Sequence, residues 1–112
     1  MNNLEKKINE FRDARDWRQF HNEKDLAISI SLEASELLEL FQWNSSEETI
    51  KNKRREIEDE LADIMIYSMM FASNLDINIE EIILNKLRKN NEKYPVEKSR
   101  GNKKKYTDLD SN

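Results

Sequence analysis

The chain has 112 residues, of which 38% are charged, with one glycine, one proline, no cysteine and a formal net charge of −4. This composition suits one domain of long helices, and the lack of cysteine excludes a disulfide framework and a thiolate nucleophile or metal site. No apolar run approaches the ~20 residues that span a membrane, and the first residues lack the apolar segment of a secretory signal. We therefore expect a cytoplasmic protein without membrane association.

Helical periodicity predicts two helices in the first half of the chain. The first covers about residues 2–16, where three apolar residues recur at helical spacing: Leu4, Ile8 and Phe11. The second covers about residues 26–43 and ends before a polar turn at 44–46. Asp25 is placed to cap this second helix.

Two more helices are predicted in the second half. The third covers about residues 47–74 and follows Ser46, a suitable cap. The fourth covers about residues 79–92, with Asn78 as its cap and a proline after Tyr94 that stops it. Its inward residues would be Ile79, Ile82, Ile83 and Leu87. The expected fold class is all-α.

Charge divides the chain into an acidic body and a basic C-terminal segment. From Lys86 to Lys105 there are nine Lys or Arg residues and two Glu, whereas the rest is strongly acidic. This division suits a ligand with a metal ion at one end and negative charge beyond, such as a nucleoside triphosphate with Mg²⁺. A solvated tail, or one that binds nucleic acid nonspecifically, is the alternative, but the acidic body argues against dedicated nucleic-acid binding. We expect an all-α domain, residues 1–95, and a basic extended arm, residues 96–112.

Two carboxylate pairs interrupt the apolar helices. Glu33 and Glu36 in the second helix, and Glu60 and Asp63 in the third, are each spaced i, i+3. At ~100° per residue, both pairs lie about 60° and about 120° from a reference residue in the apolar stripe of their helix. Packed side by side, the two helices could aim four carboxylates at one point, where a divalent cation would compensate their charge. A solvated rim of each helix is the alternative interpretation.

Five sequence strings resemble those of the all-α nucleoside triphosphate pyrophosphohydrolases, the MazG-like group, and especially its branch of deoxycytidine triphosphate pyrophosphatases. In chain order they are RDWRQFH (15–21), LEASELLELFQW (32–43), EDELADIMIY (58–67), KLRKNNEKYP (86–95) and KKYTDL (104–109). The E-x-x-E and E-x-x-D elements are individually weak, but together with FQW and N-x-x-K-Y-P they are specific. The resemblance implies a four-helix MazG-like bundle that is completed by subunit association.

The resemblance also implies an activity. Family members hydrolyse a (deoxy)nucleoside triphosphate to the monophosphate and pyrophosphate with Mg²⁺, for which Mn²⁺ is a substitute, and so serve nucleotide-pool sanitation or control of deoxynucleotide levels. By motif, the metal ligands here would be Glu33, Glu36, Glu60 and Asp63. Four acids around one ion leave a surplus, and Glu36 is our candidate for the catalytic carboxylate that accepts the proton of the attacking water.

Other residues would bind the nucleotide. By resemblance, Trp17 and Trp43 form the base and sugar pocket with His21 nearby, although aromatics at helix ends also close bundles without binding anything. The hydroxyl of Tyr67, one turn after Asp63, could reach a phosphate or the sugar. The remaining candidates are Lys86, Asn90, Lys93 and Tyr94, of which the first three share one face of the fourth helix and suit phosphates. A solvated face is the alternative for that line.

Two positions depart from the deoxycytidine branch. That branch has a His where this chain has Ile8, and it usually has a Pro where this chain has Glu23. An isoleucine cannot hydrogen-bond to a base edge, so the resemblance predicts the reaction more firmly than the base.

Self-association is expected from the third helix. Ile66, Met69 and Met70 lie on its far side from the main apolar stripe and predict a second buried face. With the family's use of paired subunits, this predicts a homodimer or homotetramer. A di-iron bundle would need Glu-x-x-His pairs, whereas the single histidine, His21, lies outside both acidic helices. A non-catalytic helical module that binds a nucleotide or a protein remains the alternative function.

Overall fold

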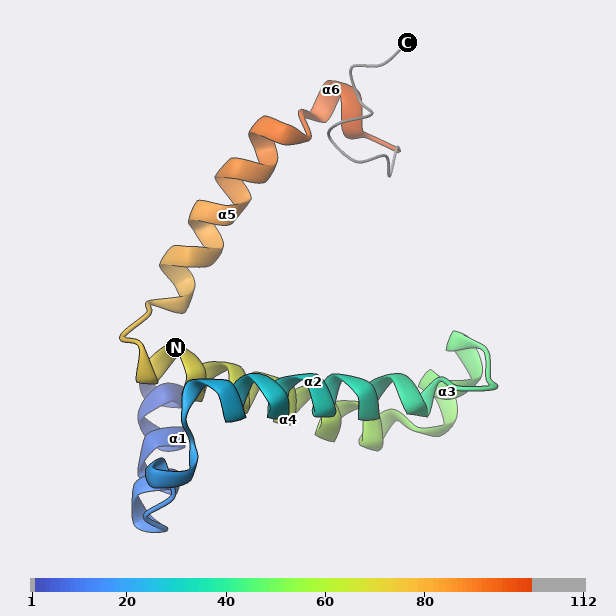
Figure 1. Cartoon of the computed structure of the whole chain (residues 1–112). Coiled ribbons are helices and arrows are strands. Elements are labelled where there is room, and N and C mark those ends of the chain that lie inside the picture. Colours follow the sequence, from blue (N-terminus) through green and yellow to red (C-terminus); the bar gives the residue numbers. More distant parts are fainter. Residues whose placement is uncertain (1, 102–112) are drawn as a thin grey trace. The chain divides into compact units, whose positions relative to one another are not determined.

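The computed structural model describes residues 2–101, which form helices and turns but no strand (Figure 1). The prediction of an all-α fold is confirmed for this range. The chain divides into two units, the first ending at Ile77 and the second beginning at Asn78. The elements of the first unit are α1 (Asn2–Ala14), the 3₁₀ helix η1 (Arg18–Phe20), α2 (Glu23–Leu40), α3 (Ser46–Asn52) and α4 (Arg54–Asn74). The second unit contains α5 (Ile79–Lys93) and α6 (Val96–Ser99). No helix within residues 2–101 has the length and apolar content needed to cross a bilayer.

Helices α2 and α4 run antiparallel and side by side as the main packed pair of the first unit (Figure 1). α2 begins earlier than predicted, because Asn22 and not Asp25 is its N-cap. The side chain of Asn22 accepts a hydrogen bond from the backbone N–H of Asp25 at 2.9 Å. The prediction of Asp25 as the cap is therefore wrong. Asp25 lies in the first helical turn, where its negative charge interacts favourably with the helix dipole.

The helix predicted over residues 47–74 is divided into α3 and α4 at Lys53. The backbone of Lys53 leaves the helical region (φ −127°, ψ 32°), and this one residue caps both helices. Ser45, one residue before the predicted cap, accepts a hydrogen bond from the N–H of Glu48 at 3.1 Å. Thr49 is buried, and its hydroxyl donates to the Ser45 carbonyl at 3.0 Å. α3 is thus a separate short helix that contacts α4.

The core of the first unit is formed by residues of α1, the start of α2 and the end of α4. The buried hydrophobic residues of the described range are Ile8, Leu26, Met69, Met70 and Ala72. The prediction that Met69 and Met70 form an outer face for association is wrong, because α1 lies against this end of α4 and both side chains are at most 3% exposed. In contrast, Leu61 and Met65, from the predicted core stripe, are 51% and 46% exposed.

Helices α1 and α4 each end in a turn of the same type, in which an aspartate has a left-handed backbone conformation. Asp16 has φ 53° and Asp76 has φ 54°. After α1, the Trp17 N–H donates to the Arg12 carbonyl at 2.9 Å; after α4, the Ile77 N–H donates to the Ala72 carbonyl at the same distance. These bonds satisfy carbonyls that a helix end leaves free, and the first of them fixes where Trp17 follows α1.

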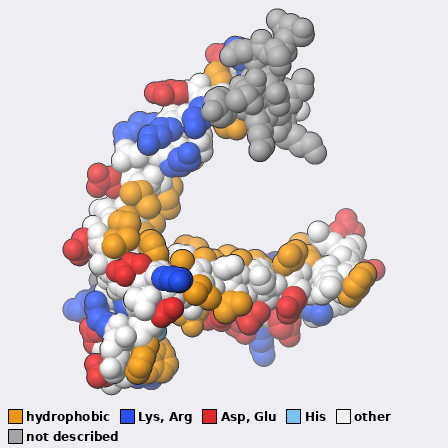
Figure 2. All heavy atoms as spheres, in the orientation of Figure 1, with side chains coloured by type: hydrophobic (Ala, Val, Ile, Leu, Met, Phe, Trp, Pro, Cys, Tyr) orange, Lys and Arg blue, Asp and Glu red, His pale blue; other side chains and the backbone are white. Residues whose placement is uncertain are grey.

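The second unit begins as predicted, with Asn78 as the N-cap of α5. Its side chain accepts a hydrogen bond from the Glu81 N–H at 3.0 Å. Three of the four residues predicted to face inward, Ile82, Ile83 and Leu87, are 50–53% exposed, and hydrophobic side chains are visible on the surface of α5 (Figure 2). The predicted extended arm instead begins with the short helix α6, which Pro95 precedes as the N-cap residue. The rest of the arm, residues 102–112, lies outside the described residues.

Candidate metal centre and nucleotide site

The carboxylates of Glu33 and Glu60 lie in the seam between α2 and α4. Along each helix, one row of less exposed residues that includes the glutamate follows a heptad spacing, which is the spacing of facing positions in paired helices. On α2 this row is Leu26, Ile30, Glu33, Leu37 and Leu40, and on α4 it is Ile57, Glu60, Ile64, Tyr67 and Phe71, although other residues of both helices are shielded as well. Both glutamates therefore occupy the middle of the packed face and not a solvated rim. The sequence pattern predicts the acids at the edge of each apolar stripe, because it classifies residues by side-chain type alone. The packed face of each helix is in fact rotated toward the glutamates.

Three carboxylates converge at this point. Glu33, Glu36 and Glu60 each offer a carboxylate oxygen, and these oxygens lie within 4.8 Å of one another. The fourth predicted ligand, Asp63, is half-buried on α4 but lies outside this group. Its charge nevertheless raises the pKa values of Glu33 and Glu60, so it belongs to the same electrostatic environment.

The converging carboxylates lack compensation within residues 2–101. Oε2 of Glu33 and Oε2 of Glu60 are buried without a hydrogen-bond partner, and neither residue has an ion-pair partner in that range. Burial, and next the contacts with Glu60 and Glu36, raises the pKa of Glu33 to about 7. The contact with Glu33 lowers the pKa of Glu60, but burial and the charges of Glu36 and Asp63 outweigh it and raise that pKa overall. Like charges held together in this way fit a divalent cation, and an all-oxygen donor set suits a hard ion such as Mg²⁺.

Tyr67 lies near the same carboxylates. Burial, followed by the charges of Glu33, Asp63 and Glu36, raises the pKa of its hydroxyl. The phenol therefore stays protonated at neutral pH and can donate a hydrogen bond to a bound anion.

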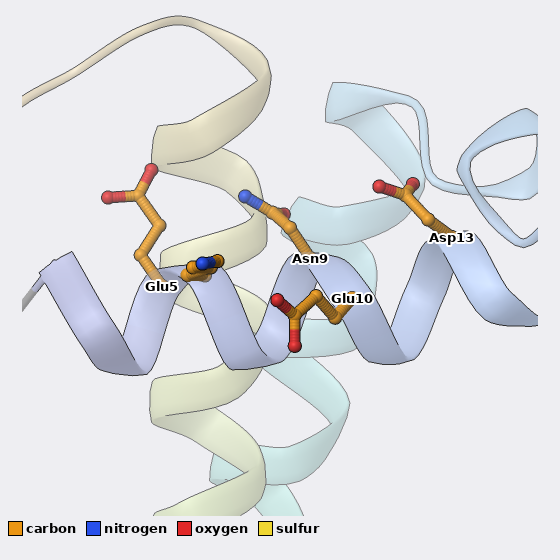
Figure 3. A pocket seen from close by; sticks show the side chains of 5 residues that line it. Glu5, Asn9, Glu10 and Asp13 are labelled. Atoms are coloured by element: carbon orange, nitrogen blue, oxygen red, sulfur yellow. The ribbon is translucent and has the colours of Figure 1, made fainter.

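A second acidic surface, on α1, shows the contrast. Glu5, Lys6, Asn9, Glu10 and Asp13 line a shallow hollow of roughly 430 Å³. Figure 3 shows the carboxylates of Glu5, Glu10 and Asp13 spread along the helix and not converging. Asp13 is also paired with Arg18. This surface is an ordinary solvated helix face.

Trp17 and His21 are brought together beside the C-terminal end of α1. Their ring centroids lie 6.2 Å apart in an edge-to-face arrangement, and the ring of Phe11 lies 5.5 Å from that of Trp17. Burial, and then the charge of Arg12, lowers the pKa of His21. The imidazole is therefore neutral at pH 7, which leaves it able to accept a hydrogen bond as well as to donate one.

Trp43 lies at the other end of α2 and is 92% exposed. The 18 residues of α2 span ~27 Å. One copy of the chain thus brings Trp17 and His21 together but does not bring Trp43 to them.

The predicted phosphate-binding residues belong to the second unit. Lys86, Asn90 and Lys93 lie on α5, and the N–H of Tyr94 donates to the Asn90 carbonyl at 2.7 Å to close the helix. Lys and Arg side chains gather toward this end of α5 (Figure 2). The relation of these residues to the carboxylates of the first unit stays a prediction.

The MazG-like family model matches residues 28–109 of the sequence. The chain belongs to the MazG-like family. Its curated relatives include proteins named dCTP pyrophosphatase 1: those of Bos taurus, Mus musculus and Homo sapiens are 39%, 37% and 33% identical over alignments of 105 positions that cover 89% of this chain. The aligned region spans 62% of the length of each of these relatives.

A solved structure has the same MazG-like fold. The crystal structure of a pyrophosphatase from Archaeoglobus fulgidus superposes with a TM-score of 0.81 at 42% sequence identity. The match covers 85% of this chain and 92% of that chain. The all-α architecture implied by the sequence strings is therefore that of a known MazG-like fold.

Two polar residues of this MazG-like chain escaped the sequence analysis. Arg12 is fully buried, and one of its terminal nitrogens donates to Oδ1 of Asn74 at 3.1 Å. A signal was present, because Arg12 follows Ile8 by four residues and so lies on the apolar face of α1. For Asn74, the last residue of α4, no sequence pattern indicates a role.

Proposed function

We propose that this MazG-like protein hydrolyses a (deoxy)nucleoside triphosphate to the monophosphate and pyrophosphate with Mg²⁺. The observation that carries the proposal is the convergence of Glu33, Glu36 and Glu60, with two buried carboxylate oxygens that have no partner within residues 2–101. The names of its relatives, dCTP pyrophosphatase and pyrophosphatase, support the same reaction class. They also make dCTP the first substrate to test.

The carboxylates would divide the chemistry between them. Glu33 and Glu60, together with Glu36 and Asp63, would hold the ion, which when bound would neutralise the triphosphate charge and orient the α-phosphate. Glu36 is exposed and hence accessible to water, which suits a carboxylate that accepts the proton of the attacking water. The water oxygen bonds to the α-phosphorus, the bond from that phosphorus to the bridging oxygen breaks, and pyrophosphate leaves.

Each unit carries groups that suit a nucleotide. Trp17 and His21 offer an aromatic face and an imidazole for the base, and Tyr67 offers a protonated hydroxyl beside the carboxylates. Cationic and amide groups on α5, at Lys86, Asn90 and Lys93, suit the β- and γ-phosphates. Tyr94 follows them directly and would complete that surface.

Association of at least two copies is part of the proposal. A single chain leaves Leu38, Leu61 and Met65 between 46% and 71% exposed, a large apolar surface for a small protein. A base pocket that contains both Trp17 and Trp43 also requires a second copy, since they lie at opposite ends of α2. We therefore propose a homodimer or homotetramer.

The reaction is tested by incubating the protein with Mg²⁺ and each common or 5-modified nucleoside triphosphate. The expected products are pyrophosphate and a monophosphate, with no orthophosphate, for at least one substrate. A Glu10→Gln variant on the solvated α1 surface is the matched control and should retain full activity. No pyrophosphate from any substrate, together with a melting temperature that Mg²⁺ does not change, would instead indicate a non-catalytic helical module.

The assembly is tested by mass in solution and by complementation. A monomeric mass at the working concentration would contradict the proposal. Trp17→Ala and Trp43→Ala proteins should each lose activity on their own. When the two variants exchange subunits at random, every dimer with one subunit of each kind has one intact pocket, so the whole mixture should regain about a quarter of the wild-type activity. No recovery after verified subunit exchange would show that the two tryptophans do not share a pocket.

A further inference from the structure

A hydrogen-bond chain joins α1, α4 and the segment that carries Trp17 and His21. The guanidinium of Arg12 donates to Oδ1 of Asn74 at 3.1 Å. Nδ2 of Asn74 in turn donates to the backbone carbonyl of His21 at 2.6 Å. The second terminal nitrogen of Arg12 donates to Oδ1 of Asn9 at 3.4 Å, which also lies on α1. One buried guanidinium therefore reaches the His21 backbone through the last residue of α4.

Arg12 and the His21 carbonyl together fix which way the Asn74 amide points. An asparagine presents an acceptor on one side and donors on the other, and only its surroundings decide between the two orientations. A guanidinium can only donate and a carbonyl can only accept, so Oδ1 of Asn74 faces Arg12 and Nδ2 faces His21. Without Arg12, Oδ1 would lose its donor, and one hydrogen bond instead of two would hold the amide. The chain is directional, and both partners support it.

The same two residues hold both ends of the segment from Trp17 to His21. The Trp17 N–H donates to the backbone carbonyl of Arg12 at 2.9 Å, and the His21 carbonyl accepts from Asn74. The ring of His21 supplies no such anchor, because its buried Nδ1 has no hydrogen-bond partner within residues 2–101. The edge-to-face pair of rings is therefore placed by its backbone, through the hydrogen bonds at Trp17 and His21.

Burial of the Arg12 side chain does not by itself stabilise the fold. The side chain is 0% exposed, its Nε has no hydrogen-bond partner within the described range, and no carboxylate there forms an ion pair with it. Removing a guanidinium from water without an opposite charge costs free energy, and only its hydrogen bonds to Asn9 and Asn74 offset that cost here. What the guanidinium supplies and an apolar residue cannot supply is the orientation of Asn9 and Asn74.

We propose that Arg12 and Asn74 are positioning residues for the nucleotide, which hold Trp17 and His21 in one arrangement against the end of α4. Neither residue touches the reacting atoms. The inference rests on the proposed function in one respect, because it takes Trp17 and His21 to contact the base. A base pocket held in this way should affect binding of the substrate and leave the chemical step nearly unchanged.

The test uses Asn74→Asp and Asn74→Leu in the full-length protein, with Ser73→Ala as the control. Asn74→Asp keeps the acceptor for Arg12 and loses the donor to His21, whereas Asn74→Leu loses both. Ser73→Ala removes the neighbouring bond from Asn9, 3.0 Å long, and leaves the chain to His21 intact. With dCTP and Mg²⁺, both Asn74 variants should raise KM about tenfold and change kcat by less than about threefold, while the control keeps both constants.

A second measurement needs no nucleotide. The indole N–H signal of Trp17 in a ¹H–¹⁵N spectrum, assigned with a Trp43→Phe variant, should shift in both Asn74 variants and stay in place in Ser73→Ala. If wild-type protein releases no pyrophosphate, the proposed function fails, but this signal still tests the positioning role. Unchanged Trp17 signals, or a KM equal to that of the control, would overturn the proposal. Should Asn74→Leu fail to fold, Asn74→Asp decides alone, since its carboxylate keeps the contact with Arg12.

Discussion

Two clusters of polar groups in the first unit differ in how their charge is compensated. In the seam between α2 and α4, three carboxylates lie together without an opposite charge from residues 2–101. At the junction of α1 and α4, one guanidinium lies among amides that accept its hydrogen bonds. The first cluster repels itself and needs something from outside the chain, whereas the second is largely complete. Buried charge alone does not mark a binding site; the informative property is the missing partner.

The strongest test of this difference is Glu60→Gln. The substitution keeps the shape of the side chain, removes one of the repelling charges and removes a candidate ligand. We expect kcat/KM to fall by about 10²–10³-fold, while the metal-free protein melts at a higher temperature. Pyrophosphate release and thermal melting in EDTA measure the two effects.

The opposite signs of the two effects are the diagnostic result for Glu60→Gln. A Glu10→Gln variant on α1 should change neither quantity. If metal-free Glu60→Gln instead melts at a lower temperature than wild type, the cluster is structural and the comparison between the two regions collapses.

A substitution in the other cluster, Arg12→Met, should lower the stability of the protein instead of raising it. Methionine fills much of the volume but leaves the side-chain oxygens of Asn9 and Asn74 without their donor. We expect a loss of about 1–3 kcal/mol in the free energy of unfolding, whether or not Mg²⁺ is present. Urea denaturation with and without Mg²⁺ measures it. A gain in stability would show that the guanidinium is a net cost to the fold.

The pH dependence is the smallest of the three effects. The pKa of Glu33 is about 7 in the folded chain against an ordinary value of 4.5, so the folded state binds more protons than the unfolded state between these values. Metal-free stability should therefore be greatest below about pH 4.5, as far as this group is concerned, and should fall as the pH rises toward about 7. Mg²⁺, which competes with these protons, should stabilise the protein more at about pH 8 than at about pH 5.

Melting curves across this pH range, with EDTA and with Mg²⁺, check the expectation. Glu33→Gln should flatten the metal-free curve between the two pKa values. A metal-free stability that rises through the same range would mean that folding lowers the pKa of Glu33 instead of raising it.

The helices could be predicted from the sequence more reliably than the way they pack. Periodicity and caps placed α5 within one residue, because Asn78 and the proline at its end are local signals. The break at Lys53 could not be foreseen, since lysine is an ordinary helix former and neither glycine nor proline marks the site. The burial of Met69 and Met70 depends on α1, a tertiary contact that the pattern of one helix does not contain.

The candidate site was predicted from the sequence in part. Glu33, Glu36 and Glu60 were identified by their spacing and by resemblance, and the structure places their carboxylates together. Their position in the seam was not predicted, because acids are usually assigned to the rim of a helix. Asn74 could not be found, since its role depends on a contact 53 residues away along the chain.

Trp43 has a consequence for how this protein would respond to selection. Its backbone φ is 68°, and its side chain is 92% exposed. A bulky residue in the left-handed region costs on the order of 1–2 kcal/mol, and an exposed ring recovers little of that by packing. Asparagine tolerates this conformation, so Trp43→Asn should melt at a higher temperature than wild type while it binds nucleotide less well. Directed evolution for heat resistance alone would discard this tryptophan early, and a screen that also demands turnover would keep it.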